Sequence, residues 1–556
     1  MQHVEIEQMT FKKTILFLQP QVRQIQKGGI PVLWYKLNIL LNRLIKKLLV
    51  PFYHLAVFLK FNWAYAYYFV GIKLAKRYYR IRMQSDQGDG FGCTTGNRAI
   101  AYLKKAIAIK PDLSFPRYGL SQYLTRLLSS MLKADESFEM MHRITELQSE
   151  IIKARQMEKL DIEFVPRSIA LGNIGVYSFL DAYIKAGILG LRPPKKLILL
   201  VPSESPVNNL CYLNYWRRYV TVISDPLTIR YLAPLERYLT NTTTDYICLH
   251  DYVLPNNVAI GVANRQWEVE NHPPVLTLST EDYERGWNCL KSLGVPEGAW
   301  FVCLHVRGHG WNDGGSSSED YRNCDIETYF SAIKTIVEAG GWVVRIGDPI
   351  SMTPLPPMKN VIDYVHSDAK SDWMDVFCCA QCRFIVGTSS GMWPISSAFG
   401  VPLVMTNLLP TVLTFTFFSQ DIFIPKLCWS IKENRYQSFR ELLTLPQSLA
   451  SSQFSYDSLG LRIEGNTAED INEVVKEMLA RLDNKSFQYT EENELLQDRF
   501  KSMAAGCGTL HGHKGVGVYA RIGNDFLSKN EHLLADCGME ERRKIWQKLS
   551  SWTGEP

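Results

Sequence analysis

Hydrophobic positions in the middle of the chain follow two alternating patterns. Short, nearly continuous apolar runs predict β-strands, and amphipathic stretches of about three turns predict helices between them. In the first series the predicted strands are 162–171, 195–202 and 220–223, and the predicted helices are 178–189 and 207–219. Residues 225–282 lack this regularity, and one more amphipathic stretch follows at 283–294. Strand–helix alternation of this kind is typical of a parallel sheet covered by helices.

A second alternating series begins at Trp300. Its predicted strands are 300–308, 342–348, 360–364, 383–388 and 401–407, and its predicted helices are 325–340, 371–381 and a segment that begins after Gly391. We therefore predict an α/β fold with two Rossmann-like, doubly wound domains at residues 161–295 and 296–470. Two such domains in tandem are expected to form a cleft between them. Residues 471–556 are mostly polar with helical periodicity and are assigned to a C-terminal helical tail.

The N-terminal part differs in charge from the rest. Residues 8–85 contain fourteen Lys and Arg and no acidic residue, whereas the rest of the chain has 47 basic and 56 acidic residues. Two apolar stretches flank Lys60, and a central lysine disfavours membrane insertion. We predict a helical, basic, membrane-associating region at 1–90 that binds an anionic surface, peripheral or monotopic, on the cytoplasmic face of the inner membrane. The alternatives are a packed helical subdomain and a single membrane span.

Residues 91–160 are predicted to be a helical connector. The segment NRAIAYLKKAIAIKPDLSFP resembles one tetratricopeptide-type helix pair, without a clear second copy. Because the basic residues are confined to the N-terminal segment, we expect no nucleic-acid partner for the α/β domains. The twelve cysteines show no paired spacing, and Cys378, Cys379 and Cys382 are interpreted as buried, reduced thiols.

Polar and glycine residues follow four strands of the second domain. In a parallel sheet these strand ends lie at one edge, where ligands bind. Hydroxyl groups, a helix N-terminus and arginines together favour a diphosphate. The predicted donor-binding residues are His305, Arg307, Arg345, Asp348, Ser389, Ser390 and Gly391. The alternative is an ordinary helix cap with both arginines in structural ion pairs.

One loop of the first domain is expected to face the same cleft. Gly172, Asn173 and Gly175 lie at a strand-to-helix turn and form a candidate acceptor-side loop, or a tight turn without a ligand. The chain contains no G-x-x-x-x-G-K-[ST] motif, no G-x-G-x-x-G after a strand and no Asp-x-Asp. We therefore expect no bound cofactor and no metal at this site, with a nucleotide diphosphate as the ligand group.

Several segments together resemble glycosyltransferases of the GT-B class, and more narrowly a group of bacterial enzymes linked to surface-polysaccharide synthesis. They are HVR (305–307), YRNCDIETY (321–329), VVRIGD (343–348), VIDY (361–364), KSDWMDVF (370–377), CRFIVGTSSG (382–391) and ARIGNDFL (520–527). The H-x-R element is also similar to that of GT-B fucosyltransferases, which implies that Arg307 contacts the donor diphosphate. Related N-terminal glycine loops often place a His after the second Gly, where this chain has Val176.

The resemblance implies metal-independent transfer of a sugar from a nucleotide-activated donor to a glycan or lipid-linked acceptor. An inverting enzyme also needs a base near the acceptor hydroxyl. The candidates are Glu319, Asp320, Asp313 and Asp181. Two other functions remain open: a non-catalytic, membrane-associated scaffold with a transferase-like fold, and a nucleotide-sugar epimerase. A scaffold would bind no nucleoside diphosphate, and an epimerase would convert the donor without an acceptor.

Overall fold

The structure is a computed structural model of the whole chain. It describes isolated residues between 64 and 109, and residues 161–534 with gaps at 204, 237–238, 241–245, 250–251, 309–318, 412–416, 445–452, 484–486 and 507–517. The chain divides into two compact units, residues 1–116 and 117–556, so the division lies inside the predicted connector. Most of the predicted regions 1–90 and 91–160 lies outside the described residues. Among the helices described, none has both the length and the apolar character that crossing a membrane requires.

In the first unit the described residues form a small packed group. Tyr67 and Val70, from the predicted membrane-associating region, pack with Ala106 from the predicted connector. The ammonium group of Lys105 lies 4.6 Å from the centre of the Tyr67 ring. These two predicted segments therefore contact each other within one unit.

The second unit begins its described part with a three-stranded parallel sheet in the order β1-β2-β3. The sequence-based prediction of a long strand at 162–171 is wrong, because the strand ends at Phe164 and residues 168–171 are helical. The fixed φ of Pro166 suits the start of a helical turn, and its carbonyl accepts from the amide of Ile169. The elements are β1 (Ile162–Phe164), α7 (Ser168–Leu171), η2 (Ile174–Val176), α8 (Tyr177–Ile188), β2 (Lys196–Leu200), α9 (Leu210–Trp216) and β3 (Val220–Ile223).

The region without clear periodicity is more ordered than its sequence indicates. It contains α10 (Pro226–Glu236), an antiparallel pair of β4 (Tyr246–Leu249) and β5 (Tyr252–Pro255), α11 (Asn256–Val269) and α12 (Thr280–Ser292). Helix α11 packs along α8 and buries Ala259, Ala263 and Trp267.

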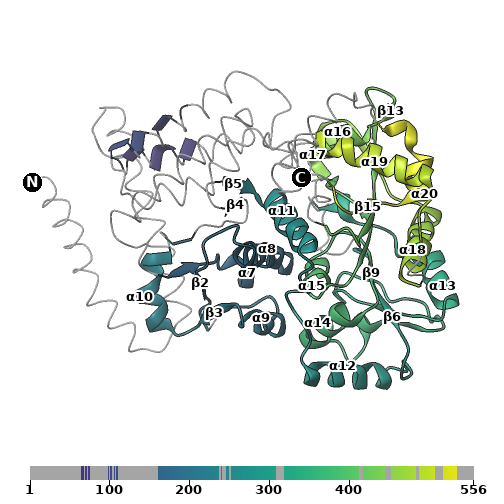
Figure 1. Ribbon diagram of the computed structural model, residues 1–556, viewed down its shortest axis with the longest axis horizontal. Coiled ribbons are helices and arrows are strands. Elements are labelled where there is room, and N and C mark those ends of the chain that lie inside the picture. The colour runs from purple at the N-terminus through teal and green to yellow at the C-terminus, as the bar shows by residue number, and fades with distance from the viewer. Residues whose placement is uncertain are drawn as a thin grey trace, which may run out of the picture. The chain divides into compact units, whose positions relative to one another are not determined.

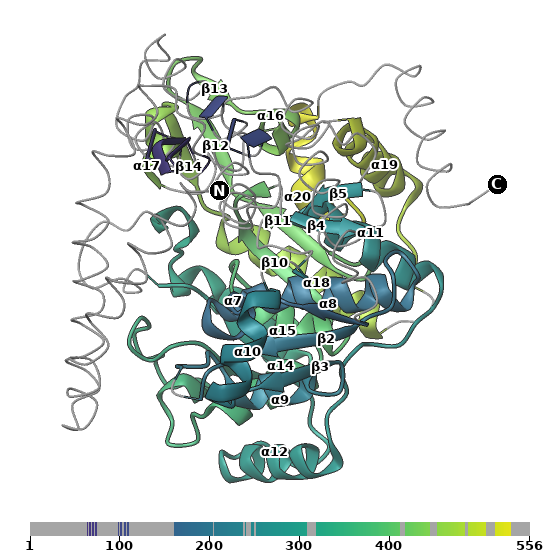
Figure 2. The same ribbon diagram turned by 90° about the vertical axis from the view of Figure 1, so that its left-hand side faces the viewer.

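A seven-stranded parallel sheet forms the centre of the second unit. Its order is β15-β11-β10-β9-β6-β7-β8, so the chain winds outward from β6 in one direction and from β9 in the other. Figure 1 labels β6, β9 and β15 of this sheet, and Figure 2 labels β10 and β11. The point where the order reverses lies between β6 and β9. The strands are β6 (Phe301–His305), β7 (Trp342–Arg345), β8 (Val361–Ile362), β9 (Ile385–Gly387), β10 (Leu403–Leu408), β11 (Ile422–Pro425) and β15 (Arg521–Ile522).

The edge strand β15 lies in the segment that sequence analysis assigns to a helical tail. It pairs with β11 and is followed by α20 (Asn524–Lys529), which contacts α18 (Ala468–Asp483) and α19 (Glu491–Gly506). The segment of the chain that connects β11 to α18 forms a small antiparallel sheet with the order β13-β12-β14. Its elements and the helices beside it are β12 (Leu427–Ser430), β13 (Arg435–Tyr436), α16 (Phe439–Thr444), α17 (Gln453–Ser458) and β14 (Leu461–Glu464). The fold is thus mixed α/β with parallel sheets.

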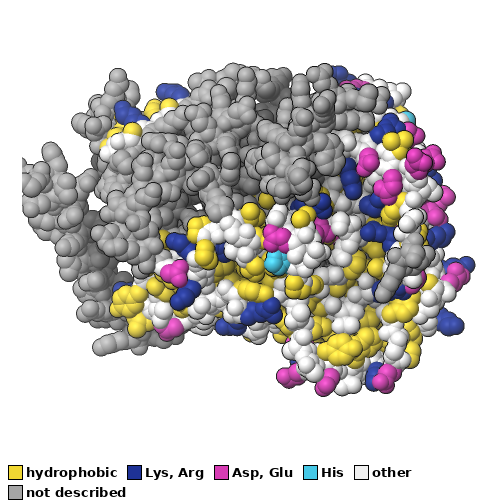
Figure 3. Space-filling model, viewed as in Figure 1, with side chains coloured by type: hydrophobic (Ala, Val, Ile, Leu, Met, Phe, Trp, Pro, Cys, Tyr) yellow, Lys and Arg dark blue, Asp and Glu magenta, His cyan; other side chains and the backbone are white. Residues whose placement is uncertain are grey.

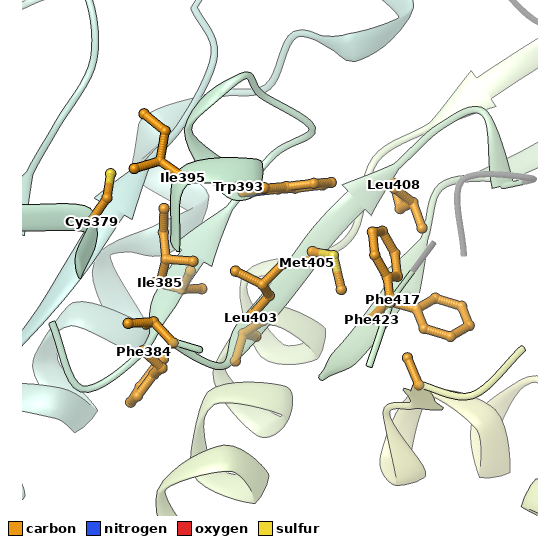
Figure 4. Close-up of a cluster of buried hydrophobic side chains, with 14 of the residues drawn as sticks. Cys379, Phe384, Ile385, Trp393, Ile395, Leu403, Met405, Leu408, Phe417 and Phe423 are labelled. Atoms are coloured by element: carbon orange, nitrogen blue, oxygen red, sulfur yellow. The ribbon is translucent and has the colours of Figure 1, made fainter. Parts of the chain in front are cut away.

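Helices α13 (Phe330–Glu338), α14 (Asp372–Gln381) and α15 (Met392–Ala398) pack against the seven-stranded sheet or against each other. Helices α14 and α15 also contact α9 and α8 of the first sheet's side (Figure 1). Apolar side chains from β9, β10 and α15 meet in one buried cluster that includes Ile385, Trp393 and Met405 (Figure 4). The same buried cluster continues to Leu180 on α8 and Tyr212 on α9. Burial of apolar surface therefore stabilises the contacts of α14 and α15 with α9 and α8.

The cysteines of the described part are free thiols. Cys378, Cys379 and Cys382 are buried, as the sequence predicts, and Cys303 is buried as well. Burial raises the pKa of Cys303 and of Cys379, which keeps both sulfurs protonated and weakly reactive.

Candidate functional site

The candidate site lies where β6 and β9 end side by side. The amide of Thr388 donates to the carbonyl of His305 at 3.0 Å, and the amide of Arg307 donates to Oγ1 of Thr388 at 2.9 Å. These bonds fix the two strand ends next to each other at the reversal of strand order. In doubly wound sheets this is the usual place for a ligand.

Gly387 makes this close approach possible. Its φ is +152°, and a Cβ added there would lie 1.8 Å from the carbonyl oxygen of His305. No side chain fits at that distance, so the two strand ends can be neighbours only with glycine at 387.

His305 is buried and electrically neutral. The pKa of His305 is lowered to about 3, mainly by burial and to a smaller extent by the positive charges of Arg322, Arg307 and Arg345. Its Nε2 lies 3.2 Å from Oγ of Ser390, which in turn accepts from the amide of Met392 at 3.2 Å. A neutral imidazole in this place orients Ser390, and it is too weak a base to take up a proton near neutral pH.

Two arginines converge on one carboxylate oxygen beside these strand ends. Nη2 of Arg307 donates to Oε2 of Glu319 at 2.6 Å, and Nη1 of Arg322 donates to the same oxygen at 3.1 Å. Nε of Arg307 also donates to Oδ1 of Asn323 at 3.2 Å. Burial lowers the pKa of Arg307, and the neighbouring charge of Arg322 acts in the same direction. Glu319 offsets this repulsion.

Arg322 is the site residue that sequence reasoning missed. Its Nε donates to Oγ of Ser389 at 3.0 Å, and its Nη2 donates to the carbonyl of Ser389 at 2.7 Å. The residue stands in the YRN segment, which the resemblance includes but to which it gives no role. The sequence feature that could have indicated Arg322 is a second arginine in the segment that follows β6, because such a segment can fold back over the end of that strand.

Arg345 and Asp348 have mainly structural partners. The side chain of Arg345 is 2% exposed, and its Nη1 donates to the carbonyl of Thr353 at 2.6 Å and to Oδ1 of Asp363 at 3.4 Å. Asp348 accepts from the amide of Ile350 at 3.1 Å and closes a turn. Arg345 contributes positive charge to the surroundings of His305. Its Nη1 is taken by these two partners, whereas its buried Nε has no hydrogen-bond partner in the structure.

The predicted acceptor-side loop touches the Ser-Ser-Gly turn directly. Asn173 caps η2 by accepting from the amide of Gly175 at 2.8 Å. A Cβ added at Gly391 would lie 2.5 Å from Cγ2 of Ile174 and 3.1 Å from the amide nitrogen of Gly175. Gly391 therefore serves the contact between the two turns. Helix α15 has only seven residues, so the arginines, and not its dipole, supply most of the positive charge.

The described base candidates differ in the partners that their carboxylates contact. Asp181 is buried on α8 and pairs with Lys185 at 2.5 Å; burial raises the pKa of this carboxyl, and Lys185 opposes the rise. Asp320 accepts from Nδ2 of Asn323 at 2.9 Å. Asp313 lies outside the described residues. Of the three described candidates, Glu319 is the one that contacts Arg307 and Arg322.

Metal-binding geometry is not evident in the described part, where no three His, Cys, Asp or Glu side chains are grouped so as to hold an ion. On the face shown in Figure 3, acidic and basic side chains of the described residues are interspersed.

Comparison with known proteins gives weak likenesses. No protein-family model matches the chain, and no curated protein matches it. Among solved structures, it is similar to the glycosyl transferase family 9 protein from Veillonella parvula DSM 2008, at 11% identity over 44% of this chain and 79% of the other, with a TM-score of 0.28. The iron-containing dodecameric glycosyltransferase TibC from enterotoxigenic E. coli H10407 shares 14% identity over 58% and 76%, with a TM-score of 0.30.

A third solved structure is the E. coli heptosyltransferase WaaC with ADP-2-deoxy-2-fluoro heptose. It shares 12% identity over 44% of this chain and 87% of the other, with a TM-score of 0.21. Likeness at this level does not by itself assign the chain to a family.

Proposed function

We propose that this protein is a glycosyltransferase of the GT-B type that uses a nucleotide-activated sugar. One observation carries the proposal: Arg307 and Arg322 converge on a single anionic oxygen at the strand-order reversal of a doubly wound sheet. A sugar nucleotide loses its nucleoside diphosphate when the glycosidic bond breaks. Two fixed guanidiniums at that place stabilise the negative charge that develops on the departing diphosphate.

The remaining groups at the strand ends have supporting roles in this reaction. Ser389, held by Arg322, and Ser390, held by neutral His305, present hydroxyl groups beside the arginines. The turn formed by Asn173 and Gly175 touches this site from the first sheet's side and is the place from which an acceptor hydroxyl would approach. We propose a glycan or lipid-linked acceptor in bacterial surface-polysaccharide synthesis, because the basic segment 8–85 favours work at an anionic membrane.

Ligand binding and product formation test this function separately. In a thermal-shift screen of ADP, UDP, GDP, CDP, dTDP and CMP, one nucleotide at a hundred times its Kd should add about 2.7 kcal/mol to the free energy of unfolding. The matching sugar nucleotide should then be consumed when an acceptor is added. The reaction should proceed in buffer with EDTA, because the arginines, and not a metal ion, stabilise the charge on the departing diphosphate. No shift with any nucleotide would favour the scaffold, and donor conversion without acceptor would favour the epimerase.

A further inference from the structure

Glu319 occupies a position that suits an anionic ligand. Its Oε2 accepts from Nη2 of Arg307 at 2.6 Å and from Nη1 of Arg322 at 3.1 Å. One oxygen bound by two guanidiniums is also the contact that a phosphate oxygen makes with paired arginines. The carboxylate is therefore a chemical stand-in for one oxygen of a phosphate group.

The two arginines of this cluster have contacts besides those with Glu319. Arg322 keeps both of its contacts with Ser389, and Arg307 keeps its contact with Asn323, whether or not the carboxylate is present. The arginine side chains are 10% and 17% exposed, whereas that of Glu319 is 38% exposed. A ligand that displaces the carboxylate thus finds two guanidiniums already in place, and Glu319 has solvent into which to turn.

Charge favours this exchange. Within the cluster two positive charges face one negative charge, so a net positive charge remains to attract an anion. A diphosphate carries more negative charge than a carboxylate and has several oxygens, so it can accept from both guanidiniums at once. The cost of displacing Glu319 reduces the apparent affinity for the ligand, since only the open form is competent to bind.

We infer that Glu319 is an internal counter-ion, which occupies the anion position of the free protein and is displaced from Arg307 and Arg322 when a diphosphate binds. The ligand class rests on the proposed function. Nη1 of Arg322, which Glu319 now occupies, becomes a direct ligand contact. Glu319 accordingly lowers the apparent affinity of the site for a diphosphate, because it must first be displaced.

Isothermal titration of the full chain with inorganic pyrophosphate tests this inference. Glu319→Gln should bind pyrophosphate about ten- to a hundredfold more tightly than the wild type, the equivalent of one charge-assisted hydrogen bond. Glu433→Gln is the matched control, because Glu433 is an exposed carboxylate paired with Arg435 on the small antiparallel sheet; its affinity should equal that of the wild type. Adding Arg322→Ala to Glu319→Gln should abolish the gain.

Glu319→Asp provides a second variant if the glutamine variant does not fold. Its shorter side chain draws the carboxylate back from both guanidiniums, so pyrophosphate should again bind more tightly than to the wild type, by a smaller factor. Unchanged or weaker affinity in the variant that folds overturns the inference. Loss of turnover with unchanged pyrophosphate affinity also overturns it, because Glu319 would then act as a base.

These outcomes are separable from failure of the proposed function. Tighter pyrophosphate binding by Glu319→Gln supports the counter-ion role even where no sugar nucleotide is consumed. Sugar transfer by the wild type, with no tightening in either Glu319 variant, leaves the function standing and removes the counter-ion role.

Discussion

Arg322 and Ser389 are joined by two hydrogen bonds, from Nε to the hydroxyl at 3.0 Å and from Nη2 to the carbonyl at 2.7 Å. The planar guanidinium thereby fixes the turn after β9 to the segment that follows β6. Lysine has a single point of donation and cannot bind both atoms in this way. Arg322→Lys should lower the free energy of unfolding by about 1–3 kcal/mol, measured in urea, because the Ser389 carbonyl loses its charged partner.

Arg435→Lys is the matched control for Arg322→Lys. Arg435 also makes two contacts, with the carboxylate of Glu441 at 2.9 and 2.7 Å, but the pair is exposed. Its replacement should change stability by less than about 1 kcal/mol. Equal losses in the two variants would contradict a special role for Arg322.

Arg307→Ala should reduce turnover more than donor binding. The contact with a departing diphosphate strengthens as negative charge develops, so it stabilises the transition state more than the bound substrate. We expect turnover to fall by roughly a hundred- to a thousandfold in steady-state assays. Arg307→Lys should recover part of the loss, because it restores the charge without the forked geometry.

The result for Arg307 has a clear contrary outcome. If Arg307→Ala keeps turnover within about threefold of the wild type, with the same circular dichroism spectrum, the residue acts only in the ion pair with Glu319. The diphosphate would then have to bind elsewhere on the strand ends.

Gly387→Ala should prevent stable folding or cost more than about 4 kcal/mol, an effect in the range of severe core defects. The added methyl would meet the His305 carbonyl oxygen at 1.8 Å, and this oxygen belongs to the backbone of a central strand, so it cannot move aside as a side chain could. Gly460→Ala is the control that measures backbone strain without a steric clash, because Gly460 has a φ of +67° and no atom within 4 Å of an added Cβ. It should cost only about 1–2 kcal/mol, by chemical denaturation.

Acid should destabilise the protein through His305. The pKa of this imidazole is about 3 in the folded state, below its ordinary value of 6.5, because burial disfavours the charged form. Between these values the unfolded chain binds a proton that the folded chain does not, so the free energy of unfolding falls as pH drops below about 6.5. His305→Gln should weaken this pH dependence.

Asp421 works in the opposite direction over part of this range. Burial raises the pKa of Asp421 to about 7 from 3.8, although its oxygens accept from two backbone amides. The folded chain keeps this proton where the unfolded chain has lost it, so stability falls as pH rises from about 4 to 7. Urea midpoints at closely spaced pH values in the His305→Gln background should reveal that slope.

Residues 8–85 should bind vesicles that contain acidic lipid. Each basic residue close to such a surface contributes about 1 kcal/mol, and salt screens the attraction. Co-sedimentation should therefore decrease with added salt and be weak with neutral vesicles. Equal binding to neutral vesicles at high salt would instead indicate hydrophobic insertion.

The sequence by itself indicated five strands of the second domain, β6 to β10, and the edge at which its polar loops gather, but not β11 or the small antiparallel sheet that follows it. Apolar runs of residues such as 301–305 and 385–387 are local signals, and parallel strands necessarily place their carboxyl ends together. For that reason the sequence predicted that His305, Arg307 and Ser389 lie close together, and they do.

The tertiary structure decided which of these side chains meet. Whether Arg322 turns toward Ser389, whether Arg345 is occupied by Asp363, and whether Gly391 is covered by Ile174 depend on contacts between segments far apart in the chain. The same holds for the edge strand β15, whose two residues carry too little periodicity to predict and are fixed by pairing with β11. These contacts and this strand pairing are determined by packing and charge compensation between distant segments. A local sequence pattern does not contain that information.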